Sequence, residues 1–228
     1  MWLEQNISAL FLIWEKRIQG VKNMIGIILF VMATKLLSQT KYGTLIQFTL
    51  RYFLQRKKII GIRIQNINAN PVRFMMLLGA LTLLPDNVLD FIKKKELMIF
   101  YKRCGDEHFN RKSSLNKRCV GEYRKDNNTI IVYDDGFYGN WYWQVMTILH
   151  EIGHFIDFSL GNNKTYKSSE DKKLHDIFLS EKQYYVRYPK GNYYSNNLRE
   201  YLSQSFAEYF VDNEFKNKCP KTSFYIQL

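Results

Sequence analysis

Cysteine is scarce in this chain, and its few cysteines lie far apart in the sequence. The 228 residues include three, Cys104, Cys119 and Cys219, with no C-x-x-C spacing. An odd count without paired spacing argues against a disulfide-rich scaffold and against a cysteine-ligated zinc site. A Cys104–Cys119 disulfide is compatible with export of the protein, and the sequence alone does not decide it.

Acidic residues are scarce in the first half of the chain. Residues 1–125 carry 22 lysines and arginines against 8 acids, whereas residues 126–228 carry 11 against 13. The net charge of +12 therefore belongs to the first half. Such a basic segment can bind nucleic acid or an anionic membrane, or it can simply form a solvated surface. No zinc-finger, RNP or helix-turn-helix spacing accompanies it, so nucleic acid is not an expected partner.

Long apolar runs are also lacking. The run at residues 24–34 is too short to span a bilayer, which takes about 20 residues. Its length and basic flank fit the hydrophobic region of a signal peptide, and helices that pack on the domain or lie on a membrane are the alternative. Residues 52–58 add an aromatic and basic patch. We expect residues 1–60 to act in export or membrane association, which places the protein outside the cell or at a membrane.

Proline is rare, and one of the four prolines marks the predicted domain boundary. The residue before a proline disfavours helix, so we expect a break at Asn70-Pro71. We predict an apolar and basic extension over residues 1–70 and a single α+β domain over residues 71–228. The hydrophobic content of 46% and aromatic content of 16% indicate a folded protein with a substantial core.

Within this domain the patterns predict several helices and a few short strands. The predicted elements are helices at residues 72–84, 87–95, from about 144 to 160 and 198–210, strands at 97–102, 120–124 and 129–133, a turn at 126–128 and a polar loop at 106–118. Residues 130–133 are a candidate edge strand, and such a strand can hold an extended peptide by backbone pairing.

The chemistry of the chain is concentrated in the stretch H-E-I-G-H-F-I-D, which begins at His150. On a helix, His150 and His154 are one turn apart on the same face. Two imidazoles so placed bind zinc at roughly 2.0–2.1 Å each, with Glu151 beside the open position to take a proton from water. Asp157 falls on the same face, where its carboxylate is predicted to orient an imidazole.

A catalytic zinc site needs a third protein ligand. The predicted helix at 198–210 carries Glu200, Gln204 and Glu208 at every fourth position among apolar and aromatic neighbours. Burying such a polar stripe is costly unless its groups have partners, which a metal site supplies. The alternative is a solvent-facing stripe, and other downstream acids remain candidates. His175 lies in a charged segment and is predicted to be exposed.

Taken together, the motifs resemble a known family. H-E-x-G-H-x-x-D, then E-x-x-x-[EQ]-S-F-A from Glu200, then C-P-K-T-x-F from Cys219 are similar to the anthrax lethal factor catalytic domain and to the secreted clostridial Pro-Pro endopeptidases. The resemblance covers residues 72–228 and is strongest from Thr147 onward. It implies an α+β, zincin-like metallopeptidase fold of the gluzincin type, with a small sheet, an H-E-x-x-H helix and a second helix that carries a glutamate ligand.

The resemblance also implies a ligand set. One Zn²⁺ per chain would be held by His150, His154 and Glu200, with Glu151 as general base and acid. The family has a second glutamate four residues after the ligand glutamate, and this chain has Gln204 there. A neutral amide can still hydrogen-bond a ligand or substrate, so we expect altered tuning of the metal rather than its loss.

The expected activity is hydrolysis of peptide bonds in a protein substrate, by a secreted toxin-like or cell-surface protease. The family tyrosine that stabilises the oxyanion falls on Tyr193, with Tyr194 adjacent, and ordinary packing is the alternative for both. Acids such as Asp134 and Asp135 would favour a basic peptide. Two other hypotheses stay open: a catalytically inactive zincin-fold binding module, hinted at by Gln204, and a membrane-associated housekeeping metalloprotease.

Overall fold

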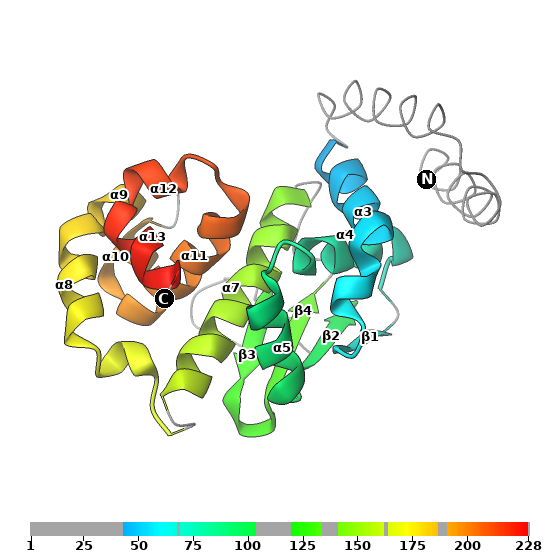
Figure 1. The fold of residues 1–228 in the computed structure, drawn as a ribbon, viewed down its shortest axis with the longest axis horizontal. Helices are drawn as coiled ribbons and strands as arrows, with labels where there is room; N and C mark the ends of the chain where they lie inside the picture. Colours follow the sequence, from blue (N-terminus) through cyan, green and yellow to red (C-terminus); the bar gives the residue numbers. More distant parts are fainter. Residues whose placement is uncertain are drawn as a thin grey trace.

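The fold is α+β. The computed structural model describes residues 43–67, 69–103, 120–133, 141–161, 164–186 and 191–227. The helices in this part are α3 (Gly43–Gln55), α4 (Pro71–Leu81), α5 (Asp86–Lys94), α7 (Trp141–Leu160), α8 (Lys172–Glu181), α9 (Gln183–Val186), α10 (Gly191–Asn196), α11 (Leu198–Val211), α12 (Phe215–Lys218) and α13 (Pro220–Gln227), with 3-10 turns η1 (Arg56–Ile59), η2 (Lys125–Asn127) and η4 (Lys167–Ser169). Helix α7 runs between the α8–α13 group and the group formed by α3–α5 and the sheet (Figure 1).

The sheet has four strands and mixed direction. Strands β1 (Arg63–Ile67), β2 (Met98–Lys102) and β4 (Thr129–Tyr133) are parallel, and β3 (Gly121–Arg124) pairs antiparallel with β4 in the order β1-β2-β4-β3. The expectation that residues 130–133 form an edge is therefore wrong, because β4 lies between two strands. All five of its residues are buried, as suits an apolar run in the interior of a sheet. The edge beside α7 is β3.

The β3–β4 hairpin confirms the predicted strand, turn and strand. Asn128 ends the turn in the left-handed region at φ 52°, which asparagine tolerates better than most residues. Its side-chain amide donates to the Lys95 carbonyl at 2.6 Å, which ties the hairpin to the end of α5. The sequence patterns thus located this part of the sheet correctly, apart from which strand forms the edge.

The described residues before Pro71 belong to the same packed unit as those after it. Strand β1 pairs with β2, and α3 lies so close to α4 that a Cβ atom on Gly79 would come 1.7 Å from the Phe48 carbonyl oxygen. Arg51 donates to Thr82 Oγ1 at 3.1 Å across the same contact. The predicted boundary at residue 70 is therefore wrong for residues 43–67. The apolar run at residues 24–34 lies outside the described residues.

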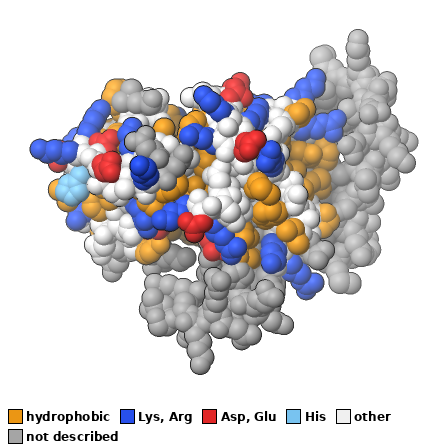
Figure 2. All heavy atoms as spheres, turned by 90° about the horizontal axis from the view of Figure 1, so that it is seen from below, with side chains coloured by type: hydrophobic (Ala, Val, Ile, Leu, Met, Phe, Trp, Pro, Cys, Tyr) orange, Lys and Arg blue, Asp and Glu red, His pale blue; other side chains and the backbone are white. Residues whose placement is uncertain are grey.

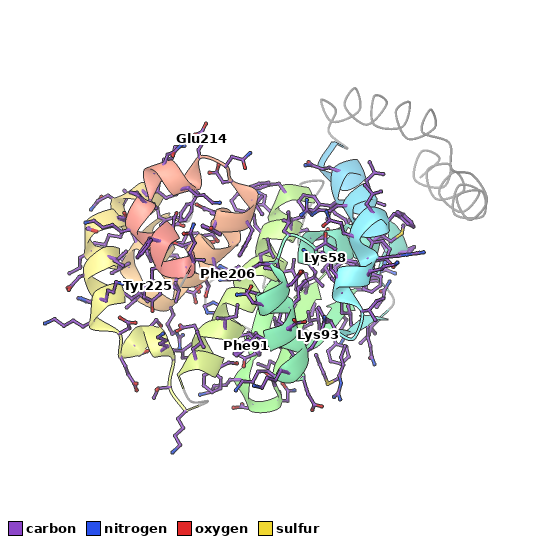
Figure 3. The ribbon with its side chains drawn as sticks, in the orientation of Figure 1. Lys58, Phe91, Lys93, Phe206, Glu214 and Tyr225 are labelled. Atoms are coloured by element: carbon purple, nitrogen blue, oxygen red, sulfur yellow. The ribbon has the colours of Figure 1, made fainter. Side chains whose placement is uncertain are left out.

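Helix α7 forms the centre of the core, and its apolar face is the predicted one. Val145, Ile148, Leu149 and Ile152 are fully buried, and Ile156 packs against them. From the next turn, Phe155 contacts Phe91 of α5 with ring centroids 5.8 Å apart, and the Phe206 side chain of α11 lies near α7 from the other helical group (Figure 3). Because both groups pack on α7, the helix that carries the histidines is held rigidly.

The C-P-K-T segment near the C-terminus has a structural role. Glu181, the last residue of α8, accepts from the backbone N–H groups of Lys221 at 2.9 Å and Thr222 at 3.0 Å. Its carboxylate thus satisfies two of the donors that a helix N-terminus leaves open. Thr222 Oγ1 also bonds the Tyr201 hydroxyl at 2.6 Å, and Cys219 is buried. The segment therefore fixes α13 against both α8 and α11.

Two features of the described part bear on the expected membrane association: the length of its apolar helices and the distribution of basic side chains on its surface. No single helix there is long and apolar enough to cross a membrane, although the pair Arg73–Leu81 and Asp86–Lys94, bent by 107°, meets the same criteria. On the face seen in Figure 2, lysine and arginine side chains are dispersed and do not form one patch. In the patch at residues 52–58, Leu54 is 75% exposed and Lys58 pairs with Asp86 at 3.3 Å. The loop at 106–118, which follows Cys104, lies outside the described residues, as does Cys119.

Candidate metal centre

Helices α7 and α11 bring the three predicted ligand residues together. One ligand atom from each of His150, His154 and Glu200 lies within 4.8 Å of the other two. Glu200 Oε2 is 3.1 Å from His150 Nε2 and 3.4 Å from His154 Nε2. The three side chains are only 10–13% exposed, so their polar atoms converge in a largely dry site.

This arrangement fits a zinc ion. A tetrahedral zinc with ligand bonds of about 2.0–2.2 Å separates its ligand atoms by roughly 3.3–3.5 Å. The two separations from Glu200 Oε2, 3.1 and 3.4 Å, are close to that range, and the histidine ligand atoms lie within 4.8 Å of each other. Two imidazole nitrogens and one carboxylate oxygen are also a donor set that zinc accepts, with a position left for water or substrate.

The electrostatics of the site favour a cation at its centre. Burial by itself raises the pKa of Glu200, but hydrogen bonds and charge from both histidines outweigh burial and hold that pKa far below its usual range. Burial lowers the pKa of both histidines, and in His150 the hydrogen bond to Glu200 and the charges of Glu151 and Glu200 more than compensate. Glu200 is therefore ionised and satisfied by the groups around it, a role that a bound metal ion would also fill.

The close crossing of α7 and α11 depends on a glycine inside the motif. A Cβ atom on Gly153 would come 2.8 Å from the Ser203 Cα, so any other residue would push the helices apart. Helix α11 begins at the Asn197 cap, whose side chain accepts from the backbone N–H groups of Arg199 at 3.1 Å and Glu200 at 3.4 Å. The cap and the glycine together place Glu200 opposite the histidines.

The hydroxyl of Ser203 orients His154, a role that sequence reasoning gave to Asp157. Ser203 Oγ and His154 Nδ1 form a hydrogen bond of 2.8 Å. Asp157 instead accepts from the Ser168 backbone N–H at 2.7 Å and the Ser168 hydroxyl at 2.6 Å. The prediction for Asp157 is wrong because its carboxylate is already used to hold the η4 turn. Ser203 lies three residues after Glu200 on the same helical face, a spacing that made it a candidate but did not rank it above Asp157.

The polar stripe on α11 is buried rather than solvent-facing. Gln204 donates to Glu208 Oε1 at 2.9 Å, and the Tyr185 hydroxyl donates to Glu208 Oε2 at 3.3 Å. Gln204 also lies close enough to His150 to raise its pKa. The buried Nδ1 atom of His150, however, has no hydrogen-bond partner of good geometry in the described part. Burial raises the pKa of Glu208 to about 7. The buried carboxyl group of the stripe is thus one helical turn beyond Gln204, on Glu208, where burial favours the protonated form.

Glu151 lies against the edge strand β3. Its side chain is buried, which raises its pKa to about 7, and it accepts from the Tyr123 backbone N–H. A Cβ atom on Gly121 would come 2.5 Å from Thr147 Cγ2 and 3.1 Å from Glu151 Cγ. The glycine therefore allows the strand to approach the predicted base, so that strand and base line the same site.

The two tyrosines of α10 differ in their surroundings. Tyr193 is 48% exposed, and burial together with the charge and hydrogen bonding of Glu200 raises its pKa. Tyr194 is more buried, with its ring 6.1 Å from the His150 ring and 5.6 Å from the Tyr185 ring. Tyr193 is thus the phenol beside the ligands that solvent or substrate can reach, and Tyr194 is mainly a packing residue.

Two further residues near the centre were missed by sequence reasoning. The Tyr166 ring lies 6.5 Å from the His154 ring, and the guanidinium carbon of Arg199 lies 4.3 Å from the Tyr166 ring centroid. Tyr166 sits in a polar segment with no periodic pattern, so nothing in the sequence marked it. Arg199 directly precedes the ligand Glu200, which was the available clue.

The remaining predicted residues lie elsewhere. His175 is exposed on α8 and takes no part in the ligand cluster, as predicted. Asp134 and Asp135 lie outside the described residues. No protein-family model matches the chain, and no curated protein matches it either. The candidate metal centre therefore rests on the geometry and chemistry of its own residues.

Proposed function

We propose that the chain is a zinc-dependent endopeptidase. The observation that carries the proposal is the convergence of the His150, His154 and Glu200 ligand atoms, with the buried Glu151 carboxylate adjacent in sequence. A zinc ion bound there would polarise the carbonyl of a peptide bond and lower the pKa of a water molecule. The chain's own residues must then move protons and bind the substrate.

Glu151 is the proton carrier in this proposal. It takes a proton from the attacking water and delivers it to the leaving amine. Burial raises its pKa, which favours the protonated form that this carboxylate takes between the two steps. Tyr193, the exposed phenol beside Glu200, donates a hydrogen bond to the oxygen on which negative charge develops.

The position of β3 suggests how a peptide binds. An extended segment can add to a sheet at its edge, and β3 is the edge beside Glu151. An edge strand next to an H-E-x-x-H helix, with a glutamate ligand from a later helix, supports a zincin-like fold of the gluzincin type similar to the lethal factor domain. We extend the proposal to a protein substrate outside the producing cell or at its surface, in keeping with that resemblance.

Metal content and cleavage test the proposal together. The full chain is loaded with zinc, dialysed, and incubated with a proteome-derived peptide library, beside a Glu151→Gln variant. We expect one zinc per chain in both proteins and cleavage only by the wild type. Zinc binding without cleavage by the wild type would favour the inactive binding module. Undiminished cleavage by Glu151→Gln would exclude the role given to Glu151.

A further inference from the structure

Arg199 brings a positive charge to the edge of the metal centre. It lies in the first turn of α11, directly before the ligand Glu200, and it is partly buried. Its charge acts on His154, on Asp157 and on Tyr166. A cation beside a site that would hold a divalent metal ion is unfavourable by itself, so its presence calls for an explanation.

The Arg199 guanidinium is held in place by stacking. Its central carbon lies 4.3 Å from the ring centroid of Tyr166, within the range of a cation–π contact. Tyr166 is held in turn, because it precedes η4, and η4 is anchored by both hydrogen bonds from Ser168 to Asp157. A side chain fixed in this way loses little freedom when it binds a ligand.

Arg199 has no carboxylate partner within the described part of the chain. No oxygen of a described acidic residue lies within 4.0 Å of its guanidinium nitrogens, whereas Arg63 and Arg124 both form such ion pairs. Asp157, on which the Arg199 charge acts, has both carboxylate oxygens hydrogen-bonded to Ser168. Stacking uses only the face of the guanidinium, so the N–H groups along its edge remain suited to a planar, bidentate anion.

We infer that Arg199, stacked on Tyr166, forms a subsite that binds a carboxylate of the peptide substrate beside the metal centre. This inference rests on the proposed peptidase function and names the chemistry of the substrate that the site selects. The carboxylate comes either from an acidic side chain at a fixed distance from the scissile bond or from the C-terminus of a short peptide. The inference differs from the expectation of a basic substrate, which depended on Asp134 and Asp135.

Peptide binding by a chain that does not cut tests the subsite directly. The full-length Glu151→Gln chain with one equivalent of zinc is applied to an array of peptides with random flanks. In one arm a fixed central Glu is compared with Gln, and in the other a free C-terminus is compared with an amide. We expect about tenfold tighter binding to the carboxylate member of one arm, the order of a single charged hydrogen bond. The arm that shows the preference identifies the source of the carboxylate.

Three further variants, each made in the Glu151→Gln background, assign the preference. Adding Arg199→Gln is expected to bring the carboxylate-to-amide ratio close to one, and Arg199→Lys to give an intermediate ratio because charge stays but the planar fork is lost. Arg63→Gln, which removes an exposed arginine paired with Glu96, is expected to keep the full ratio. Zinc content is measured for each variant as a check on folding.

The outcomes separate this inference from the proposed function. Equal binding of carboxylate and amide peptides in both arms, or an unchanged ratio in the zinc-loaded Arg199→Gln variant, overturns the subsite. Cleavage of the library by the wild type, scored separately, concerns the peptidase function alone. Cleavage without a carboxylate preference supports the peptidase function and overturns the subsite. A carboxylate preference that depends on Arg199, without cleavage, supports the subsite and overturns the peptidase function.

Discussion

Gly153 on α7 lies against Ser203 on α11, so closely that a Cβ atom on the glycine would come 2.8 Å from the serine Cα. The hydroxyl of the same serine bonds Nδ1 of His154 at 2.8 Å. The point where the two helices touch is therefore also the point where one proposed metal ligand is oriented. If the proposed metal centre binds zinc, helix packing and metal binding are coupled at this crossing, and the first two predictions concern that coupling.

Gly153→Ala should separate the two helices. Overpacking of a close contact costs about 1–3 kcal/mol of stability, and here it should also move Glu200 away from the histidines, which lowers zinc affinity. Thermal unfolding and a zinc competition titration measure the two effects. Gly79→Ala is the matched control, because its Cβ atom would clash with the Phe48 carbonyl of α3, a contact that includes neither α11 nor the proposed ligands. We expect Gly79→Ala to destabilise the chain yet leave zinc affinity unchanged in the folded protein; an equal loss of affinity in both variants would contradict the coupling.

Ser203→Ala should weaken zinc binding without a large loss of stability. A metal-bound His154 carries its proton on Nδ1 and donates it to Ser203 Oγ, and losing such a partner typically lowers metal affinity about 10–100-fold. The competition titration gives the affinity. Ser205→Ala is the control, since this serine lies on the same helix but bonds Tyr185 at 3.0 Å. Similar affinity in Ser203→Ala and the wild type would show that the hydrogen bond does not orient the ligand.

Gly121→Ala should slow peptide cleavage while zinc affinity stays constant. The new Cβ atom would clash with Thr147 and press on Glu151, and a small displacement of a catalytic group can cost up to about a hundredfold in rate. The steady-state kcat is the measurement. Adding Thr147→Ser removes the methyl group 2.5 Å from the new atom and should restore part of the rate. A single variant with normal kcat would argue against a close role for β3 at the base.

Tyr193→Phe should lower kcat by about a hundredfold with little change in zinc affinity. The reason is that its hydroxyl is the donor assigned to the oxyanion, and removal of one such donor has effects of this order. Tyr194→Phe serves as the comparison, because its ring is packed against Tyr185 and His150. We expect a much smaller effect on kcat there. If Tyr194→Phe had the larger effect, Tyr194 rather than Tyr193 would be the oxyanion donor.

Glu208→Gln should change how stability depends on pH. Burial raises the folded-state pKa of Glu208 from 4.5 to about 7, so folding favours its protonated form. The stability contributed by this group is full below pH 4.5 and is lost as pH rises through about 7. Between these limits the wild type should lose on the order of 3 kcal/mol relative to the variant.

Urea unfolding of the metal-free chain across this pH range measures the difference. Glu214→Gln is the control, because Glu214 is an exposed carboxylate that points outward (Figure 3) and pairs with Lys218. Its variant should follow the wild type closely. A parallel pH profile for Glu208→Gln and the wild type would mean that Glu208 titrates normally in the folded protein.

Periodicity and turn chemistry located α4, α5, α7 and α11 and three of the four strands, but not α8–α10, α12, α13 or β1. The apolar face of α7 and the asparagine turn before β4 follow from residues close together in the sequence, so local patterns reveal them. Which strand forms the edge depends instead on long-range pairing, and the run of apolar residues in β4 fits an interior strand as well as an edge. The same limit explains the boundary at Pro71, because nothing local to β1 shows that it pairs with β2.

The residues of the candidate site also fall into two groups: those that local spacing predicts and those that only the folded structure reveals. His150, Glu151 and His154 follow from helical spacing, and Glu200 required the resemblance to a family in addition to its polar stripe. The group that bonds His154 could not be chosen by spacing, because Asp157 and Ser203 both lie within reach and only the packing shows that Ser168 occupies the acid. Arg199 and Tyr166 come together through a stacking contact that joins a helix to a turn, and no sequence pattern encodes it.

The two helices that share the proposed metal centre are made at different times during synthesis. A growing polypeptide contains both histidines and the glutamate beside them before Glu200, which follows His154 by 46 residues, has been added. Until α11 exists and docks at Gly153, the ligand set is open and cannot retain a metal ion tightly. Order of translation thus imposes a delay on this protein, and the ability to capture zinc should appear only once its later helices have folded into place.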